Sequence, residues 1–213
     1  MSSFNLSQPT SRNIHSSILS TGKVGREEAE EAVRTLILWL GDDPLREGLL
    51  DTPARVVRAF EEWFSGYRLK PEDILSTTFE EVEGYAEPVT LRDIQFESYC
   101  EHHMAPIIGV VHISYIPDRR VIGLSKLARI VDLYAKRLQV QEKLTAQIAN
   151  TVQAVLNPKG VAVMISAEHQ CMSTRGVSKH GVDTITTQYT GEFSLDKSRQ
   201  SQFVKLVTSR ISR

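Results

Sequence analysis

The sequence predicts an α+β protein in which an antiparallel sheet is covered by helices on one face and is preceded by a helical extension. Three observations support this fold class. The chain has 213 residues and a hydrophobic content of 41%, enough for one good-sized core and an additional helical segment. The spacing of apolar residues changes from helical to strand-like from residue 87. Beyond that point the elements follow in the order strand, strand, helix, helix, strand, strand, which is typical of an antiparallel sheet with segregated helices.

The first 86 residues are predicted to hold a tail, two helices and a linking stretch. Residues 1–22 are polar and rich in small side chains, and we interpret them as a flexible tail. Residues 23–86 are interpreted as the helical extension and its linker. Apolar residues recur there at helical spacing from Ala29 to Leu40. A second helix is expected to start at Asp51, which precedes Thr52 and a proline at a favoured first-turn position.

Residues 87–213 are predicted to form the main domain. One extended run ends at Cys100, and a second covers Ile107 to Ile116. Two helices with apolar stripes follow these runs. Two more strands are expected over Val161 to Ile165 and over Thr184 to Phe193. A C-terminal helix that begins near Asp196 completes the predicted domain.

Charge and composition exclude several classes of protein. Lys and Arg number 25 and Asp and Glu number 26, so the chain lacks the basic excess of a protein that coats nucleic acid. The longest apolar stretch, Leu36 to Leu40, is too short to span a membrane, and the N-terminus has no apolar segment of the secretory type. Two cysteines do not make a disulfide framework. We expect a cytoplasmic protein with reduced thiols.

Both cysteines have histidine neighbours, which predicts a metal site. Cys100 precedes His102 and His103, and His169 precedes Cys171 by two residues. Two thiolates and one imidazole suit Zn²⁺, and three protein ligands leave the fourth tetrahedral position open, as in catalytic zinc sites. The spacing between Cys100 and His103 favours His103 over His102 as the ligand. His102 and His169 would then lie beside the metal, where they could transfer protons. The alternative is that the cysteines are only small core residues.

Several charged residues are candidates for contacts with an anionic or guanine-like ligand. Lys126 and Arg129 lie three residues apart near a predicted helix N-terminus, which attracts anions, although an ordinary solvated helix start has the same pattern. Arg175 precedes a glycine that would let the backbone approach a ligand, or would simply form a turn. Glu142, next to Gln141, could accept two N–H donors of a guanine-type edge or could merely stabilise the start of a helix.

Several motifs together resemble the GTP cyclohydrolase I family, in order and in spacing. The resemblance covers roughly residues 26 to 210, and its specificity comes from the coincidence of the motifs. They are Gly41 to Pro44, Gly48-Leu49, Asp51 to Arg55, Ser98 to His103, Gly123 to Lys126, Gln139 to Thr145 and Cys171 to Gly176.

This resemblance implies a T-fold, with a four-stranded antiparallel sheet backed by two helices, and a ring-based homodecamer with active sites at subunit interfaces. It implies conversion of GTP to 7,8-dihydroneopterin triphosphate with release of formate, the entry step to folate and pterins. A zinc ion would supply hydroxide from water at neutral pH. The resemblance implies that Cys100, His103 and Cys171 are the zinc ligands. It implies that His102 and His169 are the acid–base residues, assisted by Ser125. It further implies that Glu142, with Gln141, anchors the guanine, and that the ribose and triphosphate are bound by Ser125, Lys126, Arg129 and Arg175.

Two other functions stay open at this point. A different T-fold enzyme that acts on pterin-like substrates would use an all-histidine zinc site, and the two cysteines argue against it. A non-catalytic protein could use zinc only to stabilise its fold, but a closed site would need a fourth protein ligand. His102 or His169 could supply that ligand.

Overall fold

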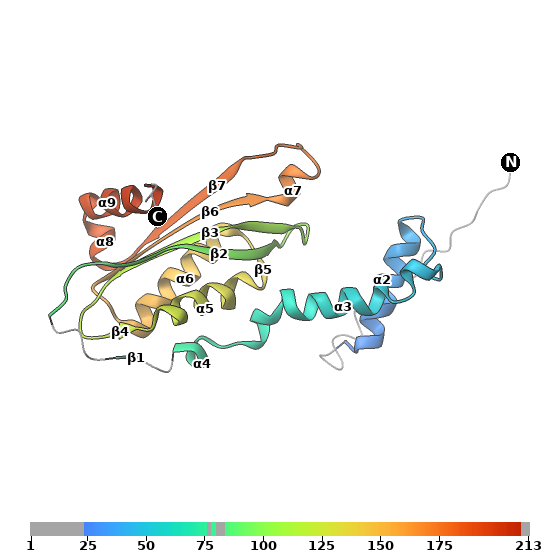
Figure 1. Ribbon diagram of the computed structural model, residues 1–213, viewed down its shortest axis with the longest axis horizontal. Coiled ribbons are helices and arrows are strands. Elements are labelled where there is room, and N and C mark those ends of the chain that lie inside the picture. Colours follow the sequence, from blue (N-terminus) through green and yellow to red (C-terminus); the bar gives the residue numbers. More distant parts are fainter. Residues whose placement is uncertain (1–23, 76–77, 80–83, 210–213) are drawn as a thin grey trace, which may run out of the picture. The chain divides into compact units, whose positions relative to one another are not determined.

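The computed structural model describes residues 24–75, 78–79 and 84–209. The tail predicted over residues 1–22 lies outside these residues. The chain divides into two compact units, Met1–Glu61 and Glu62–Arg213. Figure 1 labels their helices and strands.

The first unit contains the two helices predicted from the sequence. Helix α2 covers Arg26–Trp39, and α3 begins at Thr52 and continues to Trp63. A short 3₁₀ turn, η1, lies between them at Glu47–Leu49. The connecting loop is held by Arg46, whose guanidinium donates two hydrogen bonds of 2.8 Å to the Asp42 carboxylate. This pair lowers the pKa of Asp42 to about 2.

After α3, where the sequence predicts a linking stretch, the described residues form short elements that the sequence did not indicate. A 3₁₀ turn, η2, covers Ser65–Arg68, and α4 covers Pro71–Leu75. Strand β1, Thr78–Phe79, pairs with β4, Val121–Ile122, as a small antiparallel sheet. Elements of two to five residues are too short to show a period in the sequence, which explains why they were not predicted.

The main sheet has four long antiparallel strands, as the sequence predicts, and one short parallel strand at its edge. The order is β5-β2-β3-β6-β7. The long strands are β2 (Val89–Cys100), β3 (Pro106–Ile116), β6 (Gly160–His169) and β7 (Asp183–Tyr189). Strand β5, Leu138–Gln139, pairs parallel to the end of β2.

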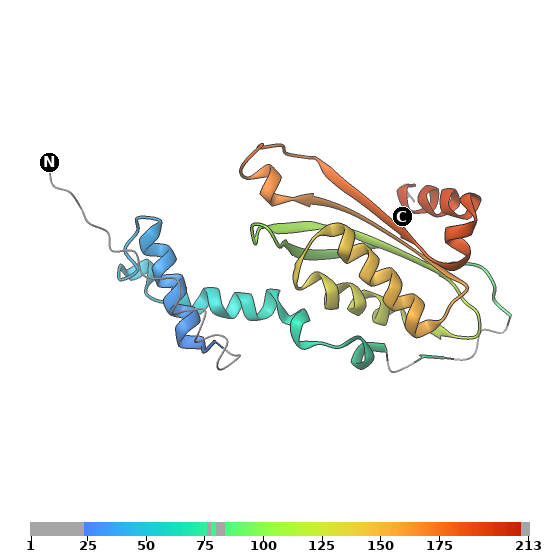
Figure 2. The ribbon, with the colours of Figure 1, turned by 180° about the vertical axis from the view of Figure 1, so that it is seen from behind.

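Two helices cover one face of this sheet, α5 (Leu124–Ala135) and α6 (Gln141–Leu156) (Figures 1 and 2). Their apolar stripes pack on the alternate β3 and β6 side chains that point to the same face, because successive strand residues point to opposite faces. The fully buried members include Val111, Ile113, Tyr115, Val163, Ile165, Leu127, Ile130, Leu144 and Ile148.

The C-terminal helices lie against the opposite face, so the prediction that helices cover one face only was incomplete. Helix α8 covers Gly191–Leu195 and α9 covers Lys197–Thr208. Their side chains form a second cluster with strand residues that point away from α5 and α6; the cluster contains Ile116, Ala162, Met164, Phe193, Phe203 and Val207. The last predicted strand is correspondingly shorter. It ends at Tyr189 because Gly191, with a φ of 52°, turns the chain into α8.

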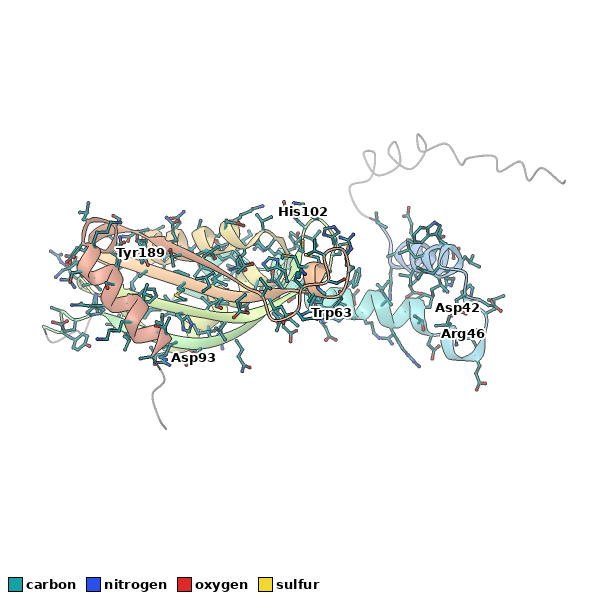
Figure 3. All side chains as sticks on the ribbon, turned by 90° about the horizontal axis from the view of Figure 1, so that it is seen from above. Asp42, Arg46, Trp63, Asp93, His102 and Tyr189 are labelled. Carbon is teal, nitrogen blue, oxygen red and sulfur yellow. The ribbon has the colours of Figure 1, made fainter. Side chains whose placement is uncertain are left out.

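One end of the sheet gathers the cysteines, and the histidines next to them, that the sequence singled out. Strands β2 and β6 end there, β3 and β7 begin there, and the one-turn helix α7 (Gln170–Ser173) follows β6. His102 lies at this end, whereas Tyr189 lies at the other (Figure 3). Among the described residues, no helix is both long enough and apolar enough to cross a membrane.

Candidate active site

A tight turn between β2 and β3 brings His103 back to Cys100. The Cys100 carbonyl accepts hydrogen bonds from the backbone N–H groups of His103 and Met104, at 3.3 and 2.8 Å. Met104 adopts a φ of 53° to close the turn. The turn is supported from the side by β5, because the N–H of Glu101 donates to the Gln139 carbonyl at 3.0 Å. As a result Nδ1 of His103 lies 3.9 Å from Sγ of Cys100.

Cys171 reaches the same place from the end of β6. It lies on α7, whose single turn is held by hydroxyl groups: Thr174 donates to the Gln170 carbonyl at 2.6 Å, and Ser173 donates to the Gln170 side chain at 3.1 Å. Because β6 pairs with β3 up to His169, the residue after next lies beside the β2–β3 turn. Burial and the neighbouring Cys100 raise the pKa of the Cys171 thiol.

Cys100, His103 and Cys171 together form a donor group of the kind that holds a metal ion. Their sulfur and nitrogen atoms all lie within 4.8 Å of one another. An ion bonded to sulfur at about 2.3 Å and to nitrogen at about 2.0 Å fits between ligands at such separations. Both cysteines are free thiols. Two thiolates and one imidazole match the preference of Zn²⁺, so the residues present fit the predicted metal.

Two further predicted residues lie next to this group. Nδ1 of His102 is 3.6 Å from Sγ of Cys100, and the ring is exposed. The Arg175 guanidinium lies 3.0 Å from Nε2 of His103. Arg175 is exposed as well, so a positive charge that an anionic ligand could reach stands beside the metal-binding group.

His169 lies at the end of β6 and is partly buried. Its Nε2 is 2.8 Å from Oε1 of Gln141, the first residue of α6. Burial lowers the pKa of His169, and the negative charge of Glu142 opposes this shift. The start of α6 is thus close to His169, and Glu142 is exposed there.

Gln141 differs from the expectation for a substrate contact. Its side chain is 1% exposed, and both ends of its amide are bonded within the protein. This geometry does not favour a direct contact with guanine. Of the predicted pair, Glu142 is the residue that a ligand can reach.

The remaining predicted residues, Ser125, Lys126 and Arg129, are not brought together with the metal-binding group in one chain. They lie in the first half of α5, whose last residue, Ala135, precedes β5 at the site end of the sheet. A helix of 12 residues is about 18 Å long, so its N-terminal part lies well away from that end.

Sequence reasoning missed the polar residues that support the site from β7 and α6. Thr186 and the Thr184 carbonyl accept hydrogen bonds from Gln141, and Thr145 contacts Thr186 at 2.6 Å. The Thr-rich composition of β7 was the available signal, but it did not show which threonines point towards α6.

Comparison with known proteins matches the sequence of this chain to one family. The family model described as GTP cyclohydrolase I matches residues 29–208. A protein named GTP cyclohydrolase 1 from Allorhizobium ampelinum is 57% identical over 190 residues, which are 89% of this chain and 94% of the relative. A protein of the same name from Brucella anthropi is 57% identical over 185 residues, 87% of each chain.

A solved structure resembles part of the chain only weakly. The crystal structure of the archaeosine synthase QueF-Like in the apo form covers 50% of this chain and 94% of its own, with 21% identity and a TM-score of 0.40, too low to carry an inference. The family model spans every residue of the candidate site, and each of the two relatives matches more than four fifths of the chain. The chain therefore belongs to the GTP cyclohydrolase I family.

Proposed function

We propose that this chain is a zinc-dependent GTP cyclohydrolase I. It opens the imidazole ring of GTP, releases formate, and rearranges and re-closes the product to 7,8-dihydroneopterin triphosphate. The observation that carries the proposal is the convergence of Cys100, His103 and Cys171 in a member of this family.

The three-residue donor group is the proposed zinc site. When bound, Zn²⁺ supplies a Lewis acid that makes a nucleophile available from water at neutral pH. The two thiols and the imidazole would hold the ion at the end of the sheet, between the β2–β3 turn and α7. Three ligands are consistent with an open coordination position.

His102 and His169 are the proposed proton-transfer residues. Opening the imidazole ring needs a proton on the ring nitrogen as the carbon–nitrogen bond breaks, and an imidazolium can donate it. The later rearrangement of the ribose needs further proton transfers, for which the second histidine and Ser125 are available. His102 lies beside Cys100, and His169 lies beside the start of α6, so the two rings approach the site from different elements.

Glu142 and three cations are the proposed substrate contacts. The exposed Glu142 carboxylate accepts the paired N–H donors of the guanine edge. Arg175, Lys126 and Arg129 bind the triphosphate, which is not a leaving group in this reaction. Its binding energy orients the base against the reacting groups.

The proposed site needs a second copy of the chain. Lys126 is the third residue of α5, near the end of that helix that lies away from the metal-binding group, and Arg129 lies near its middle. We infer from this separation that a neighbouring copy of the chain supplies some of these residues to each site. We propose a homo-oligomer with sites at subunit interfaces, a decamer as the family resemblance implies, that works in the cytoplasm.

A direct assay tests the proposal. Zinc-loaded protein is incubated with GTP and the product is oxidised, after which pterin fluorescence and formate are measured. We expect stoichiometric formation of both. A zinc-loaded protein that produces neither would favour the alternative in which the metal only stabilises the fold.

A further inference from the structure

We propose that Gln141 is a positioning residue for His169. By accepting a hydrogen bond from Nε2, it sets which ring nitrogen carries the proton and leaves Nδ1 as the acceptor. The inference rests on the proposed function only for the expected effect of Gln141 on the rate of the reaction. Its structural content, the protonation pattern of one imidazole, stands on the contacts of Gln141 alone.

The orientation of the Gln141 amide follows from its partners on β6 and β7. Nε2 lies 2.8 Å from the Thr184 carbonyl, 3.1 Å from Oγ1 of Thr186 and 3.3 Å from the Ile165 carbonyl. Carbonyl oxygens only accept hydrogen bonds, so the atom that faces them must be the amide nitrogen. A flipped amide would place its oxygen against two carbonyl oxygens in the protein interior.

The two threonines beside this amide have compatible hydrogen positions. The Thr145 hydroxyl donates to the Gln141 carbonyl at 2.7 Å, so its proton is used there. It can then only accept from Thr186, whose Oγ1 is 2.6 Å away. The lone pairs of Thr186 remain for the Gln141 amide. Every donor in this network has an acceptor, and Gln141 and Thr145 are each 1% exposed, which keeps water from competing.

The tautomer of His169 follows from the same network. With Nε2 of Gln141 turned to the strands, its Oε1 faces Nε2 of His169 at 2.8 Å. An amide oxygen only accepts, so Nε2 of the imidazole must carry a proton. The neutral ring therefore keeps its lone pair on Nδ1. The contact also fixes the ring plane, because the amide is itself held by two strands.

This arrangement is the one that a proton-transfer histidine requires. A ring that is free to rotate or to exchange tautomers presents a competent nitrogen only part of the time. The partners that orient a metal-ligating histidine are typically worth about 10- to 100-fold in metal affinity or activity, and we expect an effect of this size for an oriented proton-transfer histidine. Gln141 reaches the reaction only through His169, since its own amide is already bonded inside the protein.

Solid-state ¹⁵N NMR of zinc-loaded, histidine-labelled protein measures the tautomer directly. The His169 signal is assigned by its loss in His169→Ala. We expect the Nε2-protonated tautomer in the unaltered chain and a mixture of both tautomers in Gln141→Met. The matched control is Gln153→Met in the same helix, where the amide also bonds at both ends, to the Pro158 carbonyl at 3.0 Å and to Thr190 at 2.7 Å. It should leave the His169 signal unchanged.

A double-mutant cycle separates positioning from direct substrate binding. Gln141→Met should lower kcat by about 10- to 100-fold with little change in KM, and should have no further effect in a His169→Ala background. If Gln141→Met does not fold, Gln141→Asn is used instead. Its shorter side chain keeps the amide but moves the amide oxygen away from His169, and the same results are expected.

The outcomes distinguish this inference from the proposed function. An unchanged tautomer in the Gln141 variants, or a rise in KM that adds to the effect of His169→Ala, would overturn the positioning role. A protein without cyclohydrolase activity would overturn the proposed function, while the NMR comparison would still decide the role of Gln141.

Discussion

Nδ1 of His102 lies 3.6 Å from Sγ of Cys100, closer than Nδ1 of His103 at 3.9 Å, yet His102 does not belong to the donor group with Cys171. The tight β2–β3 turn directs the two adjacent imidazoles differently, with their ring planes at 69°. The His103 ring is thereby available to a metal, and the His102 ring lies beside it, where the proposed function assigns it a role in proton transfer.

Replacing His102 and replacing Cys171 should therefore have different effects on zinc. His102→Ala should keep its zinc and lose about 10²- to 10⁴-fold in turnover, because it removes only a proton-transfer group. Cys171→Ala should lose both zinc and activity. Metal analysis of the purified variants, together with the fluorescence assay, checks this. A zinc-free His102→Ala would mean that His102 is a ligand.

Lys126 should act on the phosphates of the substrate. Lys126→Ala removes a positive charge near the start of α5, so KM for GTP should rise by more than KM for guanosine analogues without phosphates. Steady-state kinetics with both substrates measures the difference. Equal changes in the two KM values would remove Lys126 from the phosphate site.

A site shared between copies of the chain predicts complementation of variants impaired in different residues. His102→Ala and Lys126→Ala change residues at opposite ends of the sheet-and-helix layer. If one copy supplies His102 and its neighbour supplies Lys126, mixed oligomers contain some sites in which both residues are intact. Assayed at a GTP concentration below the raised KM of Lys126→Ala, co-refolded mixtures should be more active than either variant alone. A mixture of His102→Ala with His169→Ala should show no such gain if both histidines come from one copy. Absence of recovery in the first mixture would contradict the shared site.

Acid should destabilise the fold through His112. The backbone N–H of Asp93 donates to Nδ1 of His112 at 3.1 Å, which requires the neutral ring. Burial lowers the pKa of His112 from 6.5; Arg92 adds to this shift and Asp93 opposes it. Below pH 6.5 the unfolded chain therefore binds a proton that the folded chain resists.

The stabilisation by neutral His112 is thus fully present above pH 6.5 and is lost as the pH falls towards the folded-state pKa. Urea denaturation across this range should show a smaller loss of unfolding free energy in His112→Gln than in the unaltered chain. His180→Gln, which changes an exposed histidine, is the control and should retain the full loss.

Gly109 should be intolerant of any side chain. It pairs with Ala167 across β3 and β6, and an added Cβ would collide with the Ser166 carbonyl oxygen. Gly109→Ala should lower the unfolding free energy by about 1–3 kcal/mol. In Gly123→Ala, the new Cβ would lie 3.8 Å from its nearest neighbour, so this control should unfold near the unaltered midpoint. Similar midpoints for both variants would contradict the close approach of the strands.

Local patterns in the sequence were enough to predict most of the long helices and strands and the members of the metal-binding group. Helices α2, α3, α5 and α6 repeat apolar residues at helical spacing, and β2, β3 and β6 carry strand-like runs. The metal-binding group was also predictable in its membership, because Cys100 and His103 are three residues apart and the only other cysteine, Cys171, also has a histidine neighbour.

Long-range pairing decided the rest. Cys100 and Cys171 meet because β3 pairs with both β2 and β6. The residue-by-residue register of these strand pairs cannot be read from a local sequence pattern. The same pairing places the start of α6 beside β7, which buries Gln141 against Thr184 and turns its oxygen to His169. The direction of α5 carries Lys126 away from the metal-binding group. By itself, the sequence determined which residues are candidates for the chemistry, because that depends on residue type and short spacing. Only the tertiary structure decided which of them meet within one chain, because that depends on how distant segments pair and pack.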